Sequence, residues 1–158
     1  MYPTKNDIPE TTRRQMIELC NARLADAIDL QTQSKQAHWN VKGPHFIALH
    51  ELFDKVNDEV EDYVDLIAER AVQLGGSVEG TARSVAKRST LAEYPLKIAT
   101  GRQHVEAFSS ALAAFGKLVR SAVEDSDEDK DTNDIFIEIS RGVDKWLWMV
   151  EAHLHPEA

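Results

Sequence analysis

Helical periodicity constrains this chain more than any other feature of its sequence. Four long segments repeat apolar residues at three- and four-residue steps, and no stretch alternates with the two-residue period of a strand. We therefore expect an all-α fold. Glycine, proline and charge set the boundaries of the segments. They run from about residue 10 to Gly43-Pro44, from Phe46 to Gly75-Gly76, from Pro95 to the acidic run 124–131, and from about Thr132 to Pro156.

The connections between these segments are short, long and short. The long one, residues 75–94, exceeds what a compact domain leaves without structure, so we expect a short helix near residues 81–88. One long crossover is the topology of the ferritin-like four-helix bundle. With 158 residues the chain has the length of one domain, 1–158, in which residues 1–10 form a short N-terminal tail.

Composition limits the partners. A formal charge of −9 argues against general attraction to nucleic acid or anionic lipid and favours cations. The single cysteine, Cys20, cannot form an internal disulfide, which is consistent with a reducing compartment. No apolar run approaches the roughly 20 residues that span a bilayer, and the N-terminus has no apolar signal core. We expect a cytoplasmic protein with no membrane partner.

The sequence lacks the usual mark of a metal centre inside a helical bundle. Such di-iron sites carry Glu-x-x-His on two helices, and no glutamate here is followed three residues later by histidine. The second segment offers other ligands instead. His50 and Asp54 lie one turn apart, Asp65 and Glu69 lie one turn apart, and His38 is near the end of the first segment. Imidazole and carboxylate together suit iron, manganese or zinc.

The spacing of these residues prevents them from binding one ion within one subunit. His50 and Asp65 are fifteen residues apart, which is about 22 Å along a helix. Two explanations remain open. Either these are unrelated residues on an acidic helix face, or two copies of the helix lie antiparallel across a two-fold axis. In the second case His38 and His50 of one chain face Asp65 and Glu69 of the other.

Two stretches of the chain carry distinctive motifs. The first contains His38-Trp39, Gly43-x-x-Phe46, Leu49-His50-x-x-Phe53-Asp54 and Asp65-x-x-Ala68-Glu69-Arg70. The second contains 131–135 with Ser140-Arg141 and 144–148. Both closely resemble the Dps family of mini-ferritins, named as DNA-binding proteins from starved cells, and the resemblance covers most of the chain.

That resemblance implies a ferroxidase that assembles as a homododecamer. Members oxidise paired Fe(II) with hydrogen peroxide, or with dioxygen, and store the ferric mineral inside the shell. The matching positions make His38, His50 and Asp54 the ligands from one subunit, with Asp65 and Glu69 supplied by the two-fold partner. Each such site would take two iron ions, and zinc is the alternative metal.

The resemblance also places Trp39 beside the metal centre, where it would intercept oxidising equivalents, and ordinary packing is the alternative. We assign the other two tryptophans, Trp146 and Trp148, to packing. Four histidines have no counterpart in the family pattern and are expected at the surface or at an interface: His45, His104, His153 and His155.

The acidic run 124–131 has two interpretations. It could be a solvated loop between the last two helices, as most charge runs are. By the resemblance it matches the place where the family lines its three-fold pores. Asp131 and Asp134 are then the residues expected to admit iron.

DNA binding is not expected, despite the name of the family. Members that compact DNA carry a lysine-rich tail, whereas residues 1–10 hold only Lys5, against Asp7 and Glu10. Attraction to phosphate would need a local patch such as 83–88. Two other functions remain as alternatives: a DNA-compacting structural protein with a secondary metal site, and a helical module that binds zinc without turnover.

Overall fold

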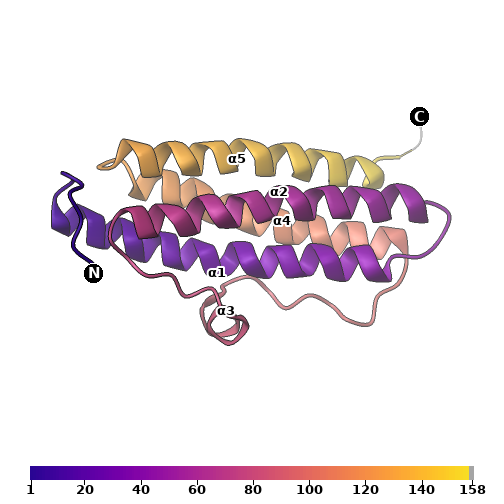
Figure 1. Ribbon diagram of the computed structural model, residues 1–158. Helices are drawn as coiled ribbons and strands as arrows, with labels where there is room; N and C mark the ends of the chain where they lie inside the picture. The colour runs from indigo at the N-terminus through magenta and orange to yellow at the C-terminus, as the bar shows by residue number, and fades with distance from the viewer. Residues whose placement is uncertain (157–158) are drawn as a thin grey trace.

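The computed structural model describes residues 1–156 and shows a bundle of four long helices, with a fifth, short helix outside it (Figure 1). The last two residues of the expected domain, 157–158, lie outside the described residues. The helices are α1 (Glu10–Asn40), α2 (Phe46–Gln73), α3 (Ala82–Arg88), α4 (Gly101–Asp125) and α5 (Lys130–Glu151), followed by the 3₁₀ turn η1 (Ala152–Leu154). No strand occurs within residues 1–156, which confirms the all-α, ferritin-like prediction. None of the helices described is long and apolar enough to cross a membrane.

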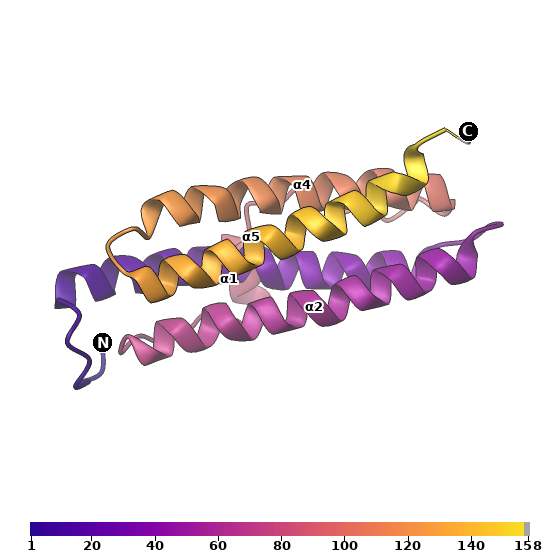
Figure 2. The same ribbon diagram turned by 90° about the horizontal axis from the view of Figure 1, so that it is seen from above.

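The helices pack as two antiparallel pairs. α1 packs mainly against α2, and α4 mainly against α5 (Figure 2). The crossover leaves α2 at one end of the bundle, runs along its length past α1, and enters α4 at the other end (Figure 1). The helix expected near 81–88 lies on this crossover as α3.

The core is built from the apolar seams that the sequence predicts. Four phenylalanines from α2, α4 and α5 are fully buried, and Phe53 meets Phe108 edge to face at 5.5 Å between ring centroids. The seam of α2 continues through Val60 and Ile67, both fully buried. Because this seam turns into the bundle, the opposite face of α2 is left at the surface of the single chain.

Two expected boundaries differ from those observed. The third long helix begins at Gly101, several residues after Pro95, because Thr100 caps it: its hydroxyl accepts from the backbone N–H of Gln103, whose side chain accepts from the backbone N–H of Thr100. The acidic run does not form a long loop. α4 continues to Asp125 and α5 begins at Lys130, so only residues 126–129 connect them.

Candidate metal site

Two histidines meet where α1 ends and α2 begins. The Nδ1–H of His38 donates to the backbone carbonyl of His50 at 2.7 Å, and the Nδ1–H of His50 donates to the backbone carbonyl of His38 at 2.8 Å. The rings stack with centroids 3.7 Å apart. Because a carbonyl can only accept, both Nδ1 atoms must carry the proton, which leaves each neutral ring its Nε2 lone pair for a metal.

Asp54 lies one turn after His50 and completes this end of the site. Its Oδ1 is 3.9 Å from Nδ1 of His38 and accepts a hydrogen bond from Nζ of Lys35 at 2.6 Å. That hydrogen bond holds the pKa of Asp54 below its ordinary value, so the carboxylate is ionised at neutral pH. The short turn 41–45 thus brings together one half of the predicted ligand set, His38, His50 and Asp54.

The other half lies further along the same helix. Asp65 and Glu69 are exposed on α2, and the fifteen residues from His50 to Asp65 are helical throughout, which corresponds to about 22 Å. Within residues 1–156, no three His, Cys, Asp or Glu side chains lie close enough together to hold a metal ion. The single chain therefore presents two separate groups of candidate ligands, one where α1 meets α2 and the other further along α2.

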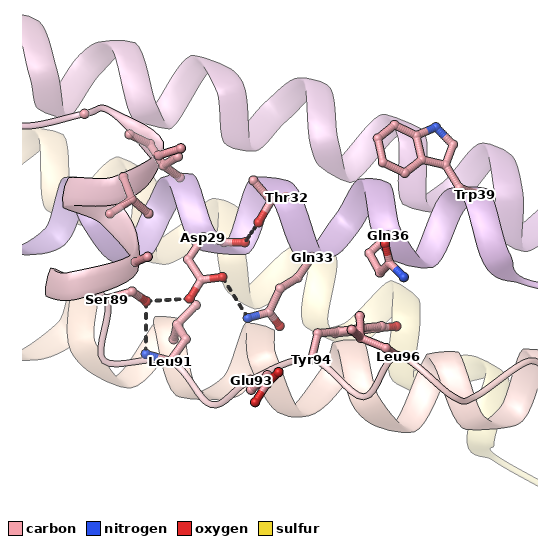
Figure 3. A pocket seen from close by; sticks show the side chains of 15 residues that line it. Asp29, Thr32, Gln33, Gln36, Trp39, Ser89, Leu91, Glu93, Tyr94 and Leu96 are labelled. Carbon is pink, nitrogen blue, oxygen red and sulfur yellow. Dashed lines mark hydrogen bonds between the residues drawn. The ribbon is translucent and has the colours of Figure 1, made fainter.

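Trp39 is next to this site and does not pack into the core of its own chain, since its side chain is 66% exposed. The ammonium of Lys35 lies 5.8 Å from the centroid of its ring. The indole also stands at one end of a groove of about 870 Å³ between α1, α3 and the crossover (Figure 3). At the far end of that groove the hydroxyl of Ser89 donates to Asp29 at 2.6 Å.

The exposure of the remaining tryptophans and histidines agrees with the sequence prediction at some positions and differs at others. Trp146 is buried, as predicted, but Trp148 is 64% exposed, so its assignment to packing is wrong within this chain. The expectation of a surface or interface position is wrong for His104, which is buried inside the bundle. The other three, His45, His153 and His155, are exposed as expected.

The buried His104 belongs to the framework of the bundle. Its Nδ1 is hydrogen-bonded to the hydroxyl of Tyr94 at 2.8 Å, which ties the crossover to α4. Loss of solvation lowers the pKa of His104, so the ring is neutral at pH 7. A signal for this was present, because His104 lies one turn before Phe108 on the apolar stripe of α4.

The acidic run contains one residue whose role the sequence did not reveal. Asp129 is buried and accepts two hydrogen bonds from Nη2 of Arg70, at 2.9 and 2.8 Å. Arg70 also donates from Nε to Thr132 at 2.9 Å. The interpretation of residues 124–131 as a solvated loop is therefore wrong for Asp129. The expected pore residues Asp131 and Asp134 are exposed.

The local basic patch is weaker than the sequence suggests. Arg88 donates to Glu18 at 2.7 Å and to Glu79 at 2.6 Å, and its hydrogen bond to Glu79 raises its pKa. One of the cations that could have contacted phosphate is therefore already neutralised by two carboxylates.

Comparison with known proteins agrees with the all-α bundle described above. A family model described as a ferritin-like domain matches residues 17–156. The chain is similar to a DNA protection during starvation protein of Agrobacterium fabrum, with 42% identity over 99% of this chain and 98% of that one. Among solved structures it is similar to DpsA14 of Streptomyces coelicolor, with a TM-score of 0.93 at 33% identity over 98% of this chain and 92% of that one. It is also similar to the Dps of Microbacterium arborescens in its high-iron form, with a TM-score of 0.86 at 34% identity over 96% and 97%.

Proposed function

Since this chain belongs to the Dps family of mini-ferritins, whose general role is iron storage and protection, we propose that it is a ferroxidase. It oxidises ferrous iron at sites shared by two subunits and stores the ferric product inside a shell of twelve. The observation that supports this best is the reciprocal hydrogen bonding of His38 and His50. Two imidazoles whose Nδ1–H groups are held by backbone carbonyls lie beside the ionised Asp54 and form part of an iron site, which lacks the carboxylates needed to complete it.

The missing carboxylates are those of Asp65 and Glu69 from a second subunit. Both are exposed on the same face of α2, and two antiparallel copies of this helix would place them opposite His38 and His50 of the neighbouring chain. Each two-fold contact then contains two equivalent sites. The subunit interface is the active site in this arrangement.

The completed site would bind two ferrous ions as substrate, and each ion would give up one electron. Two Fe²⁺, one H₂O₂ and two protons give two Fe³⁺ and two H₂O. Peroxide is therefore reduced by two electrons together, and no hydroxyl radical is released. Carboxylates and imidazoles are ligands for both oxidation states of iron. Three carboxylates per site, from Asp54, Asp65 and Glu69, stabilise the additional charge of the oxidised ions.

Iron reaches the interior through the acidic corner between α4 and α5. Asp131 and Asp134 are exposed there. In a closed shell their negative charge would concentrate cations at a pore.

Exchange of ligands between subunits tests the shared site. Neither His38→Ala/His50→Ala nor Asp65→Ala/Glu69→Ala should oxidise iron normally alone, because every site lacks part of its ligand set. When the two variants are assembled together, each two-fold contact that joins one of each creates one site with all four altered ligands present and one with none. Oxidation of Fe(II) on addition of peroxide should therefore partly return.

The control for this experiment is the fold of each variant, measured as helicity and particle mass. None of the four residues belongs to the buried seam of α2, so both variants should remain helical. Mixed shells of verified composition that stay as inactive as either parent would show that the ligands do not come from opposite subunits. A wild-type protein that binds zinc but consumes no Fe(II) with peroxide or dioxygen would instead be the non-catalytic module.

A further inference from the structure

The turn between α1 and α2 is held from outside by the end of the crossover, which enters α4 beside it (Figure 1). The N–H of Lys42 in this turn donates to the carbonyl of Ala99 at 2.9 Å, and the carbonyl of Lys42 accepts from the N–H of Gly101 at 3.2 Å. Within residues 1–156, these are the only backbone hydrogen bonds that join the turn to a segment other than its own two helices. The placement of the turn therefore depends on residues 99–101.

The start of α4 also packs next to one of the two metal-site histidines. A Cβ atom on Gly101 would lie only 2.7 Å from Cδ1 of Leu49, so a glycine allows α4 to approach α2 closely here. Leu49 is buried and directly precedes His50. The crossed hydrogen bonds of His38 and His50 measure 2.7 and 2.8 Å, and a shift of about 0.5 Å would bring them to the limit of the normal range. Their geometry is therefore sensitive to small movements of the two helix ends.

One buried side-chain pair fixes the end of the crossover in turn. The hydroxyl of Tyr94 is hydrogen-bonded to Nδ1 of His104 at 2.8 Å, and both side chains are buried. Tyr94 is the only buried residue in the stretch 92–97, so this part of the crossover is attached to the bundle through its side chain. Because His104 lies in the first turn of α4, the hydrogen bond closes residues 94–104 into a loop that contains both partners of Lys42.

Stability alone does not explain a histidine at this buried position. Nε2 of His104 has no hydrogen-bond partner within residues 1–156, and a buried polar atom without a partner costs free energy. Two apolar side chains would avoid that cost, but apolar burial has no preferred direction. The hydrogen bond between Tyr94 and His104 sets a distance and an orientation that apolar packing would leave open.

We infer that Tyr94 and His104 are positioning residues for the metal site, although neither belongs to its ligand set. Their hydrogen bond holds residues 99–101 in place, this segment holds the turn 41–45, and the turn sets the orientation of the two imidazoles. The inference rests on the proposed function. It gives the end of the crossover the task of bracing one half of the shared site.

Titration of the assembled protein with Co²⁺ under anaerobic conditions tests this role, because the visible spectrum of Co²⁺ reports both its binding and the geometry of its ligands. In Tyr94→Phe, which removes only the hydroxyl, the affinity for Co²⁺ should fall by on the order of tenfold, within the usual range for coupled sites. The amide hydrogens of Lys42 and Gly101 should also exchange with solvent faster than in the wild type, because the contact between the turn and α4 opens more often.

A matched pair of variants at His104 separates the hydrogen bond from the loss of the ring. His104→Asn keeps a hydrogen-bonding group near the position of Nδ1, whereas His104→Leu has a similar size and removes it. The asparagine variant should therefore bind Co²⁺ more tightly than the leucine variant. Val119→Ala is the control for stability, because Val119 is fully buried on the same helix about 22 Å further along. It should lower the melting temperature and leave the affinity for Co²⁺ unchanged.

The outcomes separate this inference from the proposed function. If His38→Ala/His50→Ala binds Co²⁺ as tightly as the wild type does, the proposed site is wrong and the inference fails with it. If that variant loses binding while Tyr94→Phe binds Co²⁺ normally, or exchanges its amide hydrogens at the wild-type rate, the site stands and the positioning role is overturned. Equal weakening in Val119→Ala would also overturn it, since the effect would then follow from stability alone.

Discussion

Substitution of Asp129 by asparagine should destabilise the chain far more than the same substitution two residues later. Asp129 and Arg70 form an ion pair in which the side chains are 3% and 7% exposed. Asparagine keeps the shape of the side chain and can still cap α5, where Asp129 now accepts from the backbone N–H of Asp131. The change removes the charge and replaces one of the two acceptor oxygens with an NH₂ group, which cannot accept a hydrogen bond from Arg70 or Thr132.

The structure gives the magnitude of this effect. Removal of one partner from a buried ion pair leaves the other charge uncompensated, at a cost of about 3–5 kcal/mol. The lower end applies, because the amide oxygen of asparagine can still accept one hydrogen bond from Arg70. A loss of about 3 kcal/mol lowers the melting temperature of a chain of this size by roughly 6–12 °C.

The matched control is Asp131→Asn. This residue is 84% exposed at its side chain and lies 3.9 Å from the same guanidinium, so its loss should cost less than about 0.5 kcal/mol. Both variants change the net charge equally. Thermal unfolding followed by circular dichroism, at one protein concentration because assembly adds stability, would compare them. Equal shifts in the two variants would refute a buried, charge-dependent contact.

Acid should abolish the difference between the wild type and Asp129→Asn. Burial acts to raise the pKa of Asp129, but hydrogen bonds from Thr132 and Arg70 outweigh it and leave the pKa below its ordinary value. The stabilisation is complete above the pKa of the unfolded side chain, about 4, and is lost as the pH falls through the lower pKa of the folded state. Melting curves below pH 4 should therefore converge.

Four further predictions concern the pore, the framework and the assembly. Asp131→Asn with Asp134→Asn should slow iron uptake about tenfold at low ionic strength without loss of the shell. An unchanged rate would show that neither residue has a role in iron entry. Tyr94→Phe should cost about 1–3 kcal/mol in urea unfolding, because Nε2 of His104 finds no other partner within residues 1–156 and Nδ1 would lose its own. Since the pKa of His104 is lowered by desolvation, stability should fall as the pH drops below about 6.5, and His104→Gln should reduce that slope. Light scattering should give a mass of twelve chains, and a fully active monomer would contradict both the shell and the shared site.

The sequence predicted the helices well because a helix depends on the spacing of residues that are close together in the sequence. Apolar residues at helical spacing identify the seams, and the length of the crossover was enough to predict α3. Trp148 shows that hydrophobic character alone does not predict whether a residue is buried. It lies two positions, or about 200° of helical rotation, from the buried Trp146, so both cannot face the core.

What the sequence could not show depends on contacts between distant residues. Asp129 looks like one more acid in an acidic run, and its partner Arg70 is 59 positions away on another helix. The pairing of Lys35 with Asp54 and the crossed hydrogen bonds of His38 and His50 likewise depend on how the turn 41–45 folds back. Spacing predicted that the ligands lie in two groups, but not how either group is oriented.

The end of α2 shows how this chain could combine the proposed metal site at its surface with a stable bundle. Glu69 and Arg70 are adjacent in the sequence, and a helix turns by about 100° per residue. Glu69 is therefore exposed, while Arg70 points inward to Asp129 and Thr132. The buried contact of Arg70 holds the start of α5, and with it Asp131, against the turn of α2 that carries Glu69. Glu69 thus faces outward as a proposed ligand, while its neighbour Arg70 anchors the helix that carries the proposed pore residues. Loss of Glu69 should therefore leave the bundle intact.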